Sequence, residues 1–164
     1  MKIQYIDLNT DNKIYIDVLK SDQSINQYIH VDDIKLYVDY LLKTPNVKYK
    51  FVFHNGVLVG ALHIETTEKV GTFSIEILSK FQKRGVGYQI LTDLKQNKFK
   101  LDINAYIVYI ESYNVNSIKL FEKSEFILDG IQDNLHKYVY IMRWFISDIL
   151  KNMQIKKTTL LIVL

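Results

Sequence analysis

The chain has 164 residues, of which 48% are hydrophobic, and its 21 Lys and Arg against 18 Asp and Glu give a formal net charge of +3 at pH 7. This size and apolar content predict one globular domain that buries a continuous core. The absence of cysteine excludes a disulfide framework, a thiol nucleophile and thiolate metal sites. Charges of both signs are mixed along the chain, a pattern that does not require nucleic acid as a partner.

Neither end of the sequence carries the pattern of a targeting or membrane segment. The N-terminal stretch MKIQYIDLNTDNK lacks the apolar core of a signal peptide. The longest apolar run, LLIVL at residues 160–164, is far shorter than the roughly 20 residues that a membrane span needs. We therefore expect a soluble, cytoplasmic protein without a membrane partner.

The first half of the chain predicts a helix followed by three strands. Residues 32–43 place Ile34, Tyr37 and Leu41 at helical spacing behind two acidic residues. Two strand-like runs then flank Asn55-Gly56, a pair that supplies the positive φ angles of a two-residue type I′ hairpin turn. A third strand, TFSIEIL, follows.

The second half predicts a crossover unit and a closing hairpin. A helix over residues 85–99 and a strand over 104–112 complete a strand–helix–strand unit. A short helix over 116–126 and two antiparallel strands over 126–131 and 137–144 follow. The predicted fold class is α/β, a mixed layer fold.

A single domain over residues 1–144 accounts for these elements. Residues 145–164 are predicted as a C-terminal extension, helix-like with an apolar end. This extension could pack on the domain's own sheet or against a second subunit, so a homodimer stays open.

The stretch SKFQKRGVGYQILTDL places a glycine-rich turn between a strand end and a helix start. Such a turn exposes backbone N–H groups at the positive end of the helix dipole, and Gly85 and Gly87 lack the Cβ atoms that would keep an anion away. Three cations around it would add charge-assisted hydrogen bonds to a phosphate: Lys80, Lys83 and Arg84. Glycines before a helix also serve chain reversal or packing, so both interpretations stay open. The stretch lacks the Gly-Lys-Ser/Thr ending of a P-loop and the third glycine of a dinucleotide fingerprint.

Three landmarks resemble the GNAT family of N-acetyltransferases. The hexapeptide Gln82-Lys83-Arg84-Gly85-Val86-Gly87 fits the family signature of Arg or Gln, two residues, Gly, one residue, then Gly or Ala. Asn114 and LFEKSEF, residues 120–126, are similar to the family's Asn and the short helix that ends near Tyr-Glu-Lys-x-Gly-Phe. The hairpin with Gly60 looks like the second and third strands, so the resemblance covers about residues 2–144.

The resemblance implies a mostly antiparallel central sheet flanked by helices, with a splayed strand pair that holds the pantetheine arm of acetyl-coenzyme A. The residues that it assigns to coenzyme A are Ile77, Leu78, Ser79, Gln82, Lys83, Arg84, Gly85, Val86, Gly87, Tyr88 and Asn114. Residues 77–79 would supply backbone groups to the pantetheine, and residues 83–88 would bind the pyrophosphate. Asn114 also suits a helix N-cap, and residues 77–79 could be ordinary sheet.

Glu76 is the candidate proton acceptor. Amide formation from a thioester needs a neutral amine, a proton acceptor, stabilisation of the oxyanion and a departing thiolate. A carboxylate near a closed cleft can have its pKa raised, which suits Glu76 for this task. Strand alternation places Glu76 on the face opposite Ile75 and Ile77. If that face is solvated, Glu76 is an ordinary surface carboxylate, and this alternative stays open.

The candidate general acid departs from the family pattern. Family members commonly carry a Tyr on the helix after the Asn to protonate the thiolate, and the matching position here is Phe121. Either coenzyme A leaves as a thiolate stabilised by solvent and backbone donors, or a nearby hydroxyl substitutes. Tyr113 is the candidate substitute, with Ser112 and Ser117 as neighbours. Glu125 replaces the usual Gly before the closing Phe, so a left-handed turn there would be strained.

Three functions from different classes follow. The first is an acetyltransferase that moves acetyl from acetyl-coenzyme A to a primary amine of a small molecule, an amino sugar or a protein N-terminus. The second is a non-catalytic module that binds acyl-coenzyme A as a sensor or scaffold. The third is a nucleic-acid binder, which no basic stripe supports.

The resemblance also implies where the acceptor amine is contacted, at roughly residues 11–45 and 129–136. These segments carry no pattern that names the acceptor. Four histidines are scattered without ligand spacing, so no metal is predicted: His30, His54, His63 and His136.

Overall fold

The computed structural model describes residues 2–29 and 31–146. In this part of the chain seven strands form one sheet in the order β1-β2-β3-β4-β5-β7-β6. The strands are β1 (Gln4–Asp7), β2 (Val47–His54), β3 (Val57–Thr67), β4 (Val70–Ile77), β5 (Ala105–Glu111), β6 (Ile127–Gln132) and β7 (Leu135–Ile141). The helices are α1 (Ile14–Lys20), α2 (Gln23–Asn26), α3 (Ile34–Lys43), α4 (Val86–Lys95) and α5 (Val115–Lys123), with a 3₁₀ turn, η1 (Ser79–Phe81).

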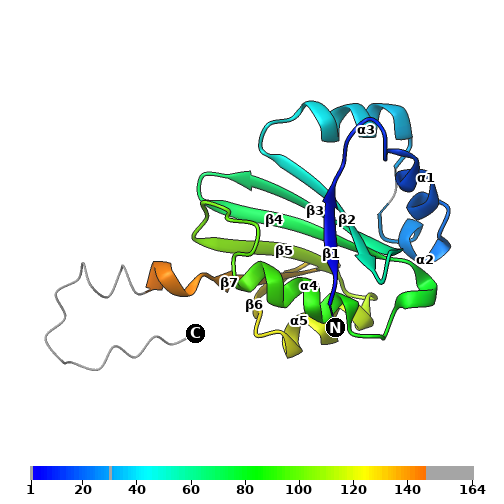
Figure 1. Ribbon diagram of the computed structural model, residues 1–164. Coiled ribbons are helices and arrows are strands. Elements are labelled where there is room, and N and C mark those ends of the chain that lie inside the picture. Colours follow the sequence, from blue (N-terminus) through cyan, green and yellow to red (C-terminus); the bar gives the residue numbers. More distant parts are fainter. Residues whose placement is uncertain (1, 30, 147–164) are drawn as a thin grey trace, which may run out of the picture.

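The sheet is antiparallel except where β5 runs beside β4. Strands β4 and β5 are parallel and pair only at Val70 with Ala105 and at Gly71 with Tyr106. Beyond these two pairs the described strands have no further ladder contacts with each other, so they diverge toward their C-terminal ends (Figure 1). The predicted mixed, mostly antiparallel sheet with a splayed strand pair is confirmed.

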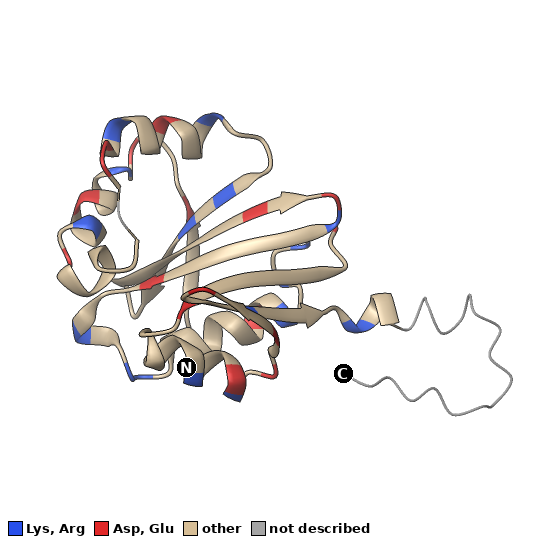
Figure 2. Cartoon of the chain, turned by 180° about the vertical axis from the view of Figure 1, so that it is seen from behind, with Lys and Arg blue, Asp and Glu red and all other residues tan. Residues whose placement is uncertain are grey.

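Helices cover both faces of the sheet, and each layer has its own core. Helices α4 and α5 pack on one face around Ile90, Leu94 and Phe121. Helices α1, α2 and α3 pack on the other face, where Ile16 and Leu19 are fully buried. Figure 1 shows the first helical layer below the sheet and the second above and to the right of it. Charged residues lie mainly on the helices and at strand ends, whereas most of the length of the central strands is uncharged (Figure 2).

The local signals of the sequence appear where they were predicted. Asn55 and Gly56 have φ angles of 49° and 77° and join His54 to its cross-strand partner Val57. The side chain of Asp33 accepts a hydrogen bond from the backbone N–H of Leu36 (3.0 Å), which caps α3. The predicted helix over residues 85–99 is shorter than expected and ends at Lys95. Beyond Ile146, the predicted C-terminal extension lies outside the described residues.

Gly60 fixes the position of the end of β4. A Cβ atom at Gly60 would lie 2.1 Å from the carbonyl oxygen of Glu76. Only glycine therefore permits this approach of β3 to β4. Just beyond, the Leu78 N–H donates to the carbonyl of Val59 (3.0 Å).

Candidate active site

A cleft of about 610 Å³ opens where β4 and β5 diverge. Its walls come from α2, the inner ends of β4 and β5, the loop before α4, and α5. Of the residues singled out in the sequence, those that line the cleft are Glu76, Ile77, Gln82, Lys83, Gly85, Val86, Gly87, Tyr88, Asn114, Ser117 and Phe121. Leu78, Ser79, Arg84 and Tyr113 are not among the lining residues.

The N-terminus of α4 presents a run of free backbone donors. The first N–H group that returns to the helix is that of Gln89, which donates to the carbonyl of Gly85 (3.0 Å). Across the described residues, the N–H groups of residues 83–88 have no protein acceptor. Positive φ angles at Lys83 (58°) and Gly85 (85°) turn the chain into this conformation. Consecutive free N–H groups at a helix N-terminus form a binding site for an anion such as a phosphate.

The two glycines of the loop have different roles. Gly85 has a positive φ, and nothing lies within 4 Å of where its Cβ would be, so it keeps the approach to the donors open. At Gly87 a Cβ would lie 2.8 Å from Leu120 Cδ2 and 3.2 Å from Ile77 Cδ1. Gly87 therefore allows α4 to pack closely on α5 and β4. The packing alternative left open in the sequence analysis therefore applies to Gly87, whose N–H still belongs to the run of free donors.

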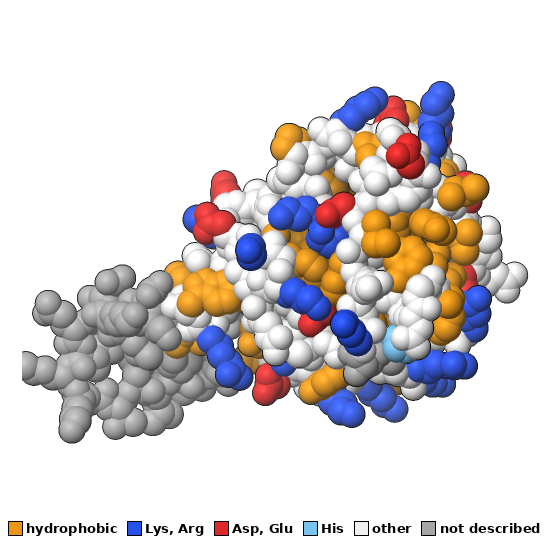
Figure 3. Space-filling view, in the orientation of Figure 1, with side chains coloured by type: hydrophobic (Ala, Val, Ile, Leu, Met, Phe, Trp, Pro, Cys, Tyr) orange, Lys and Arg blue, Asp and Glu red, His pale blue; other side chains and the backbone are white. Residues whose placement is uncertain are grey.

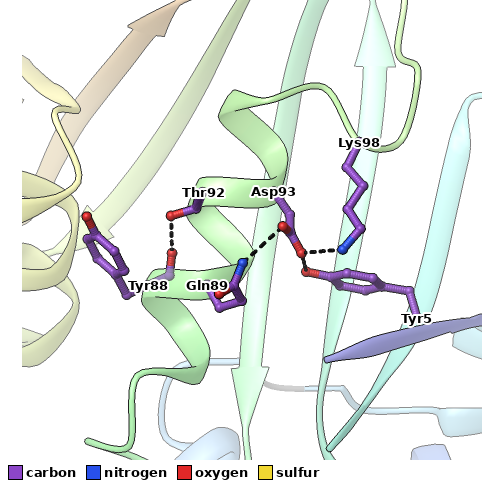
Figure 4. A network of polar contacts seen from close by, with 6 residues as sticks. All are labelled: Tyr5, Tyr88, Gln89, Thr92, Asp93 and Lys98. Carbon is purple, nitrogen blue, oxygen red and sulfur yellow. Dashed lines mark hydrogen bonds and ion pairs between the residues drawn. The ribbon is translucent and has the colours of Figure 1, made fainter. Parts of the chain in front are cut away.

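A buried carboxylate anchors α4 to the edge of the sheet. Asp93 is 3% exposed, and its Oδ2 atom accepts hydrogen bonds from the Tyr5 hydroxyl (2.7 Å) and Lys98 Nζ (3.0 Å). Gln89 Nε2 donates to the other oxygen (3.1 Å), one turn earlier in α4. Figure 4 shows these groups converging on Asp93 between α4 and β1. Burial, together with Asp93, raises the pKa of the Tyr5 hydroxyl, so Tyr5 stays a neutral donor. This network holds α4 in place below the free donors.

Positive charge gathers beside the loop. Lys80 Nζ and the Arg84 guanidinium lie 5.1 and 5.9 Å from the centre of the Phe81 ring. Figure 3 shows basic side chains at the lower right of the molecule, where Figure 1 places the segment between β4 and α4. Gln82, the first residue of the motif, donates through Nε2 to the carbonyl of Ile77 (3.1 Å) and to Ser24 Oγ (2.8 Å). Gln82 thus ties the loop to β4 and α2.

The backbone of residues 77–79 is less free than the sequence interpretation assumed. The Leu78 N–H is bonded to Val59, and the Ser79 N–H donates to Asp22 Oδ2 (2.8 Å). Because Leu78 points its N–H toward β3, alternation directs the backbone groups of Ile77 and Ile75 toward the gap. Since the Ile77 carbonyl already accepts from Gln82, the groups available to a ligand in the gap begin at the Ile77 N–H and extend back along β4.

Asn114 caps α5 and also lines the cleft. Its Oδ1 atom accepts a hydrogen bond from the Ser117 N–H (3.2 Å), as expected for an N-cap. The side-chain Nδ2 atom has no hydrogen bond within the described residues, whereas the backbone N–H donates to the carbonyl of Glu111 (2.8 Å). Asn114 therefore fits the capping interpretation and keeps a donor for a ligand.

Glu76 is one of the most buried polar residues. It is 1% exposed, and its Oε1 atom lies 3.1 Å from Lys20 Nζ and 3.3 Å from the Tyr49 hydroxyl. The alternative that Glu76 is a surface carboxylate is wrong, because α1 and α3 cover this face. The Oε2 atom has no hydrogen-bond partner in the described chain, and the residue belongs to the cleft wall. Burial raises the pKa of Glu76, although Lys20 and Tyr49 act in the opposite direction. Sequence reasoning missed Lys20, whose only signal is a Lys on the inner side of a short helix.

Phe121, at the family's usual Tyr position, and Tyr113, the candidate substitute acid, lie in different environments. Phe121 is 5% exposed and stacks on Phe73 at a centroid distance of 5.9 Å. Tyr113 is 61% exposed on the loop after β5 and stacks on Tyr28. The neighbouring Glu111 raises the pKa of the Tyr113 hydroxyl, which makes that hydroxyl a weaker acid. Glu125 adopts a φ of 64°, the left-handed turn that the sequence predicted to be strained.

Residues 14–126 match the acetyltransferase (GNAT) family, and the chain belongs to this family. The match covers both motifs and every cleft-lining residue except Leu135. No curated protein matches the sequence. Among the residues that the structure describes, no helix is long and apolar enough to cross a membrane.

Several solved structures share the fold. Spermidine N-acetyltransferase from Vibrio cholerae, in complex with CoA and spermine, has a TM-score of 0.73 and 13% identity, covering 88% of this chain and 98% of that one. The N-acetyltransferase PseH from Campylobacter jejuni, in complex with acetyl coenzyme A, has a TM-score of 0.68 and 17% identity, covering 85% and 99%. An acetyltransferase of the GNAT family from Streptococcus pneumoniae has a TM-score of 0.67 and 12% identity, covering 86% and 99%.

Proposed function

We propose that the protein is an N-acetyltransferase that moves acetyl from acetyl-coenzyme A to a primary amine of a small molecule, an amino sugar or a protein N-terminus. The observation that carries this proposal is the meeting of three features in one cleft. These are the gap between β4 and β5, the free N–H groups of residues 83–88, and the unpaired oxygen of Glu76. The cytoplasmic location predicted from the sequence is part of the same proposal.

Each part of acetyl-coenzyme A has a matching part of the cleft. The pyrophosphate would lie on the N–H groups of residues 83–88, with Lys83 beside it. The pantetheine arm would run along the gap, where its amides would pair with the backbone of Ile75 and Ile77. Asn114 Nδ2 would donate to the pantetheine or adenosine part. The GNAT relatives that contain CoA or acetyl coenzyme A support this assignment.

The reaction then needs little covalent machinery. The neutral amine attacks the thioester carbon, the C–N bond forms and the C–S bond breaks. The excess proton of the amine passes to Glu76 Oε2, directly or through water, and on to solvent. Holding the amine beside the thioester converts a bimolecular step into a nearly unimolecular one. The departing thiolate takes a proton from solvent or from a hydroxyl such as that of Tyr113.

Calorimetric titration with acetyl-coenzyme A and with free coenzyme A, followed by thiol release against a panel of amines, tests the proposal. We expect binding of both ligands and turnover with at least one amine. Gly85→Val should weaken binding of both by about tenfold or more, because a β-branched residue is strained at positive φ and would narrow the approach to the donors. Gly130→Val is the matched control, since Gly130 also has open space around its Cβ position but lies on β6.

Glu76→Gln separates binding from catalysis. This variant should bind acetyl-coenzyme A with nearly unchanged affinity and lose about a hundredfold or more in kcat, the usual effect of removing a general base. A folded wild-type protein that binds neither form of coenzyme A would overturn the assignment of the cleft.

One observation favours a second candidate, a non-catalytic module that senses acyl-coenzyme A. Phe121 occupies the position where the family commonly places a Tyr, and its ring is packed in the core. This candidate expects binding of acetyl-coenzyme A without thiol release for any amine. Turnover by the wild-type protein would decide against it.

A further inference from the structure

Two carboxylates occupy equivalent positions on the diverging strands. Val70 pairs with Ala105 in the parallel ladder, and Glu76 and Glu111 stand six residues beyond these two partners. Equal offsets along parallel strands bring residues to the same level of the sheet. Glu76 and Glu111 therefore flank the gap from its two sides, and both line the cleft.

The two carboxylates also lie on the same face of the sheet. On β5, Tyr106, Val108 and Ile110 belong to the core below α4 and α5, so alternation places Glu111 on the opposite face. Glu76 contacts Lys20 and Tyr49, which belong to the side covered by α1, α2 and α3. The carboxylate face of the cleft is thus separate from the face on which α4 and α5 carry the free donors.

In the described part of the chain, an ion pair compensates the charge of Glu76, whereas none compensates that of Glu111. Glu76 is paired with Lys20, but no cation forms an ion pair with Glu111 within residues 2–29 and 31–146. The Oε2 atom of Glu111 is buried and has no hydrogen-bond partner there. The cations that line the cleft, Lys83 and Lys123, belong to the loop before α4 and to the end of α5. Leaving a buried carboxylate oxygen without a partner is costly, and a ligand with a positive charge would remove that cost.

Aromatic rings stand beside this carboxylate. Tyr28, after α2, and Tyr113, two residues after Glu111, stack at a centroid distance of 5.7 Å and an interplanar angle of 23°. The Tyr113 hydroxyl interacts with Glu111, which places the ring pair next to the carboxylate. On the same face of β5, Tyr109 is 58% exposed. The faces of aromatic rings attract ammonium groups, and a carboxylate among such rings is a typical site for an organic cation.

We propose that Glu111, with the rings of Tyr28 and Tyr113, binds a second positively charged group of the acceptor. The acceptor is then a diamine or another amine that carries a separate cationic group. One amine faces Glu76 and reacts, and the other is held by Glu111. Reaction of the amine that faces Glu76 rests on the proposed function. Binding of a cation at Glu111 does not require turnover.

The test compares two amines with the same carbon chain, putrescine with two amino groups and n-butylamine with one. Calorimetric titration is carried out on the protein with and without bound coenzyme A. Putrescine should bind about tenfold more tightly than n-butylamine, the order expected for one additional charge-assisted contact. Glu111→Gln should reduce the affinity for putrescine to that for n-butylamine. Asp102→Asn is the matched control, because the Asp102 side chain is 88% exposed and lies outside the cleft.

Two further variants separate the ring of Tyr113 from its hydroxyl. Tyr113→Phe should retain putrescine binding within about twofold, whereas Tyr113→Ala should weaken it several-fold, because a cation is attracted by the ring face. In turnover, Glu111→Gln should raise the KM for putrescine by a larger factor than the KM for n-butylamine.

Equal affinity of the wild-type protein for the two amines, in both the free and the coenzyme A-bound state, would overturn the proposal. A Glu111→Gln variant that loses kcat equally with both amines would also overturn it, since Glu111 would then act on the reacting amine. Absence of coenzyme A binding with preserved discrimination between the amines would count against the proposed function alone. Thermal unfolding of each variant verifies that it is folded.

Discussion

Lys20 Nζ lies 3.1 Å from Glu76 Oε1, and the two side chains are 4% and 1% exposed. The pair joins α1 to β4 across 56 positions of sequence. A buried carboxylate without a counter-charge would take up a proton more readily, and the charge of Lys20 opposes this rise in the pKa of Glu76. Lys20 is therefore a positioning residue for the proposed proton acceptor.

Removing one member of this pair should destabilise the protein more than removing both. Lys20→Met should cost about 3–5 kcal/mol of unfolding free energy, because it leaves Glu76 buried without its partner. The double variant Lys20→Met with Glu76→Gln should recover most of that loss. Urea unfolding of the wild type, the two single variants and the double variant measures the coupling. Lys43→Met, at an exposed pair with Asp39, should leave the unfolding midpoint nearly unchanged. Additive effects of the two buried substitutions would contradict the coupling.

The value of kcat/KM should decrease at acidic pH, because Glu76 must be unprotonated to accept a proton. Burial raises the pKa of Glu76 above its usual range, with Lys20 and Tyr49 opposing the shift. We expect kcat/KM to rise as the pH increases through this raised pKa, and the rise should move to higher pH in Lys20→Met. The effect on stability has the opposite sign. The favourable contribution of a carboxyl with a raised pKa is complete below its unfolded pKa and is lost as the pH increases through the folded one.

The control for this pH profile is His63, which also lies near Lys20 and has its pKa lowered by burial. Tyr37, another titratable neighbour, has its pKa raised by burial and by the charge of Glu76, so it stays neutral across the profile. His63→Gln should retain the acidic limb in assays between about pH 5 and 9. If the pH dependence on the acidic side is lost in His63→Gln, the titrating group is the imidazole of His63 instead of Glu76.

Replacing Gly60 by alanine should destabilise the protein, whereas the same substitution at Gly130 should have little effect on stability. A Cβ at residue 60 would lie 2.1 Å from a backbone oxygen of β4, which cannot move as a side-chain end can. Gly60→Ala should therefore cost about 1–3 kcal/mol, the usual range for overpacking, and should lower kcat by displacing Glu76. Gly130→Ala should change the unfolding free energy by less than about 0.5 kcal/mol. Similar thermal and urea unfolding curves for both variants would show that β3 and β4 can separate at low cost.

Phe121→Tyr tests whether a hydroxyl at the family position assists departure of coenzyme A. Phe121 lines the cleft, so a hydroxyl on its ring would add a proton donor on the α5 side. We expect kcat to increase by about tenfold, at the low end of the range for general acid catalysis. Unchanged kcat in single-turnover assays would show that the thiolate leaves without a dedicated acid. Tyr113→Phe is the companion variant, and a large loss of kcat there would identify Tyr113 as the acid.

The features that the sequence predicted are those with a local signal. The turn at Asn55-Gly56 and the loop from Gln82 to Gly87 depend on residue types that few other conformations require. The environment of Glu76 could not be predicted in this way. Strand alternation correctly placed Glu76 on the face of the sheet opposite to that of Ile75. Whether solvent reaches that face depends on α1, a short helix with no strong periodic pattern. The ion pair with Lys20 depends on tertiary packing across many intervening residues.

The role of Gly87 was also beyond the reach of local reasoning. A glycine in an anion-binding turn and a glycine at a helix contact have the same sequence appearance. The position of Leu120 distinguishes the two roles of glycine, and Leu120 lies on α5, which β5 separates from α4 in the sequence. Likewise, the hydrogen bonds from the Leu78 and Ser79 N–H groups to Val59 and Asp22 could not be predicted from the local sequence.

The early end of pairing between β4 and β5 means that this sheet contains two free strand edges in its middle rather than only at its rim. Backbone amides on such edges exchange with solvent readily, because no neighbouring strand protects them. A ligand that bridges the gap acts as an eighth strand and makes one continuous sheet of the two parts. Hydrogen exchange along the inner edge of β4 should therefore slow on addition of coenzyme A, and the same ligand should shield the protein from edge-to-edge association with other copies of itself.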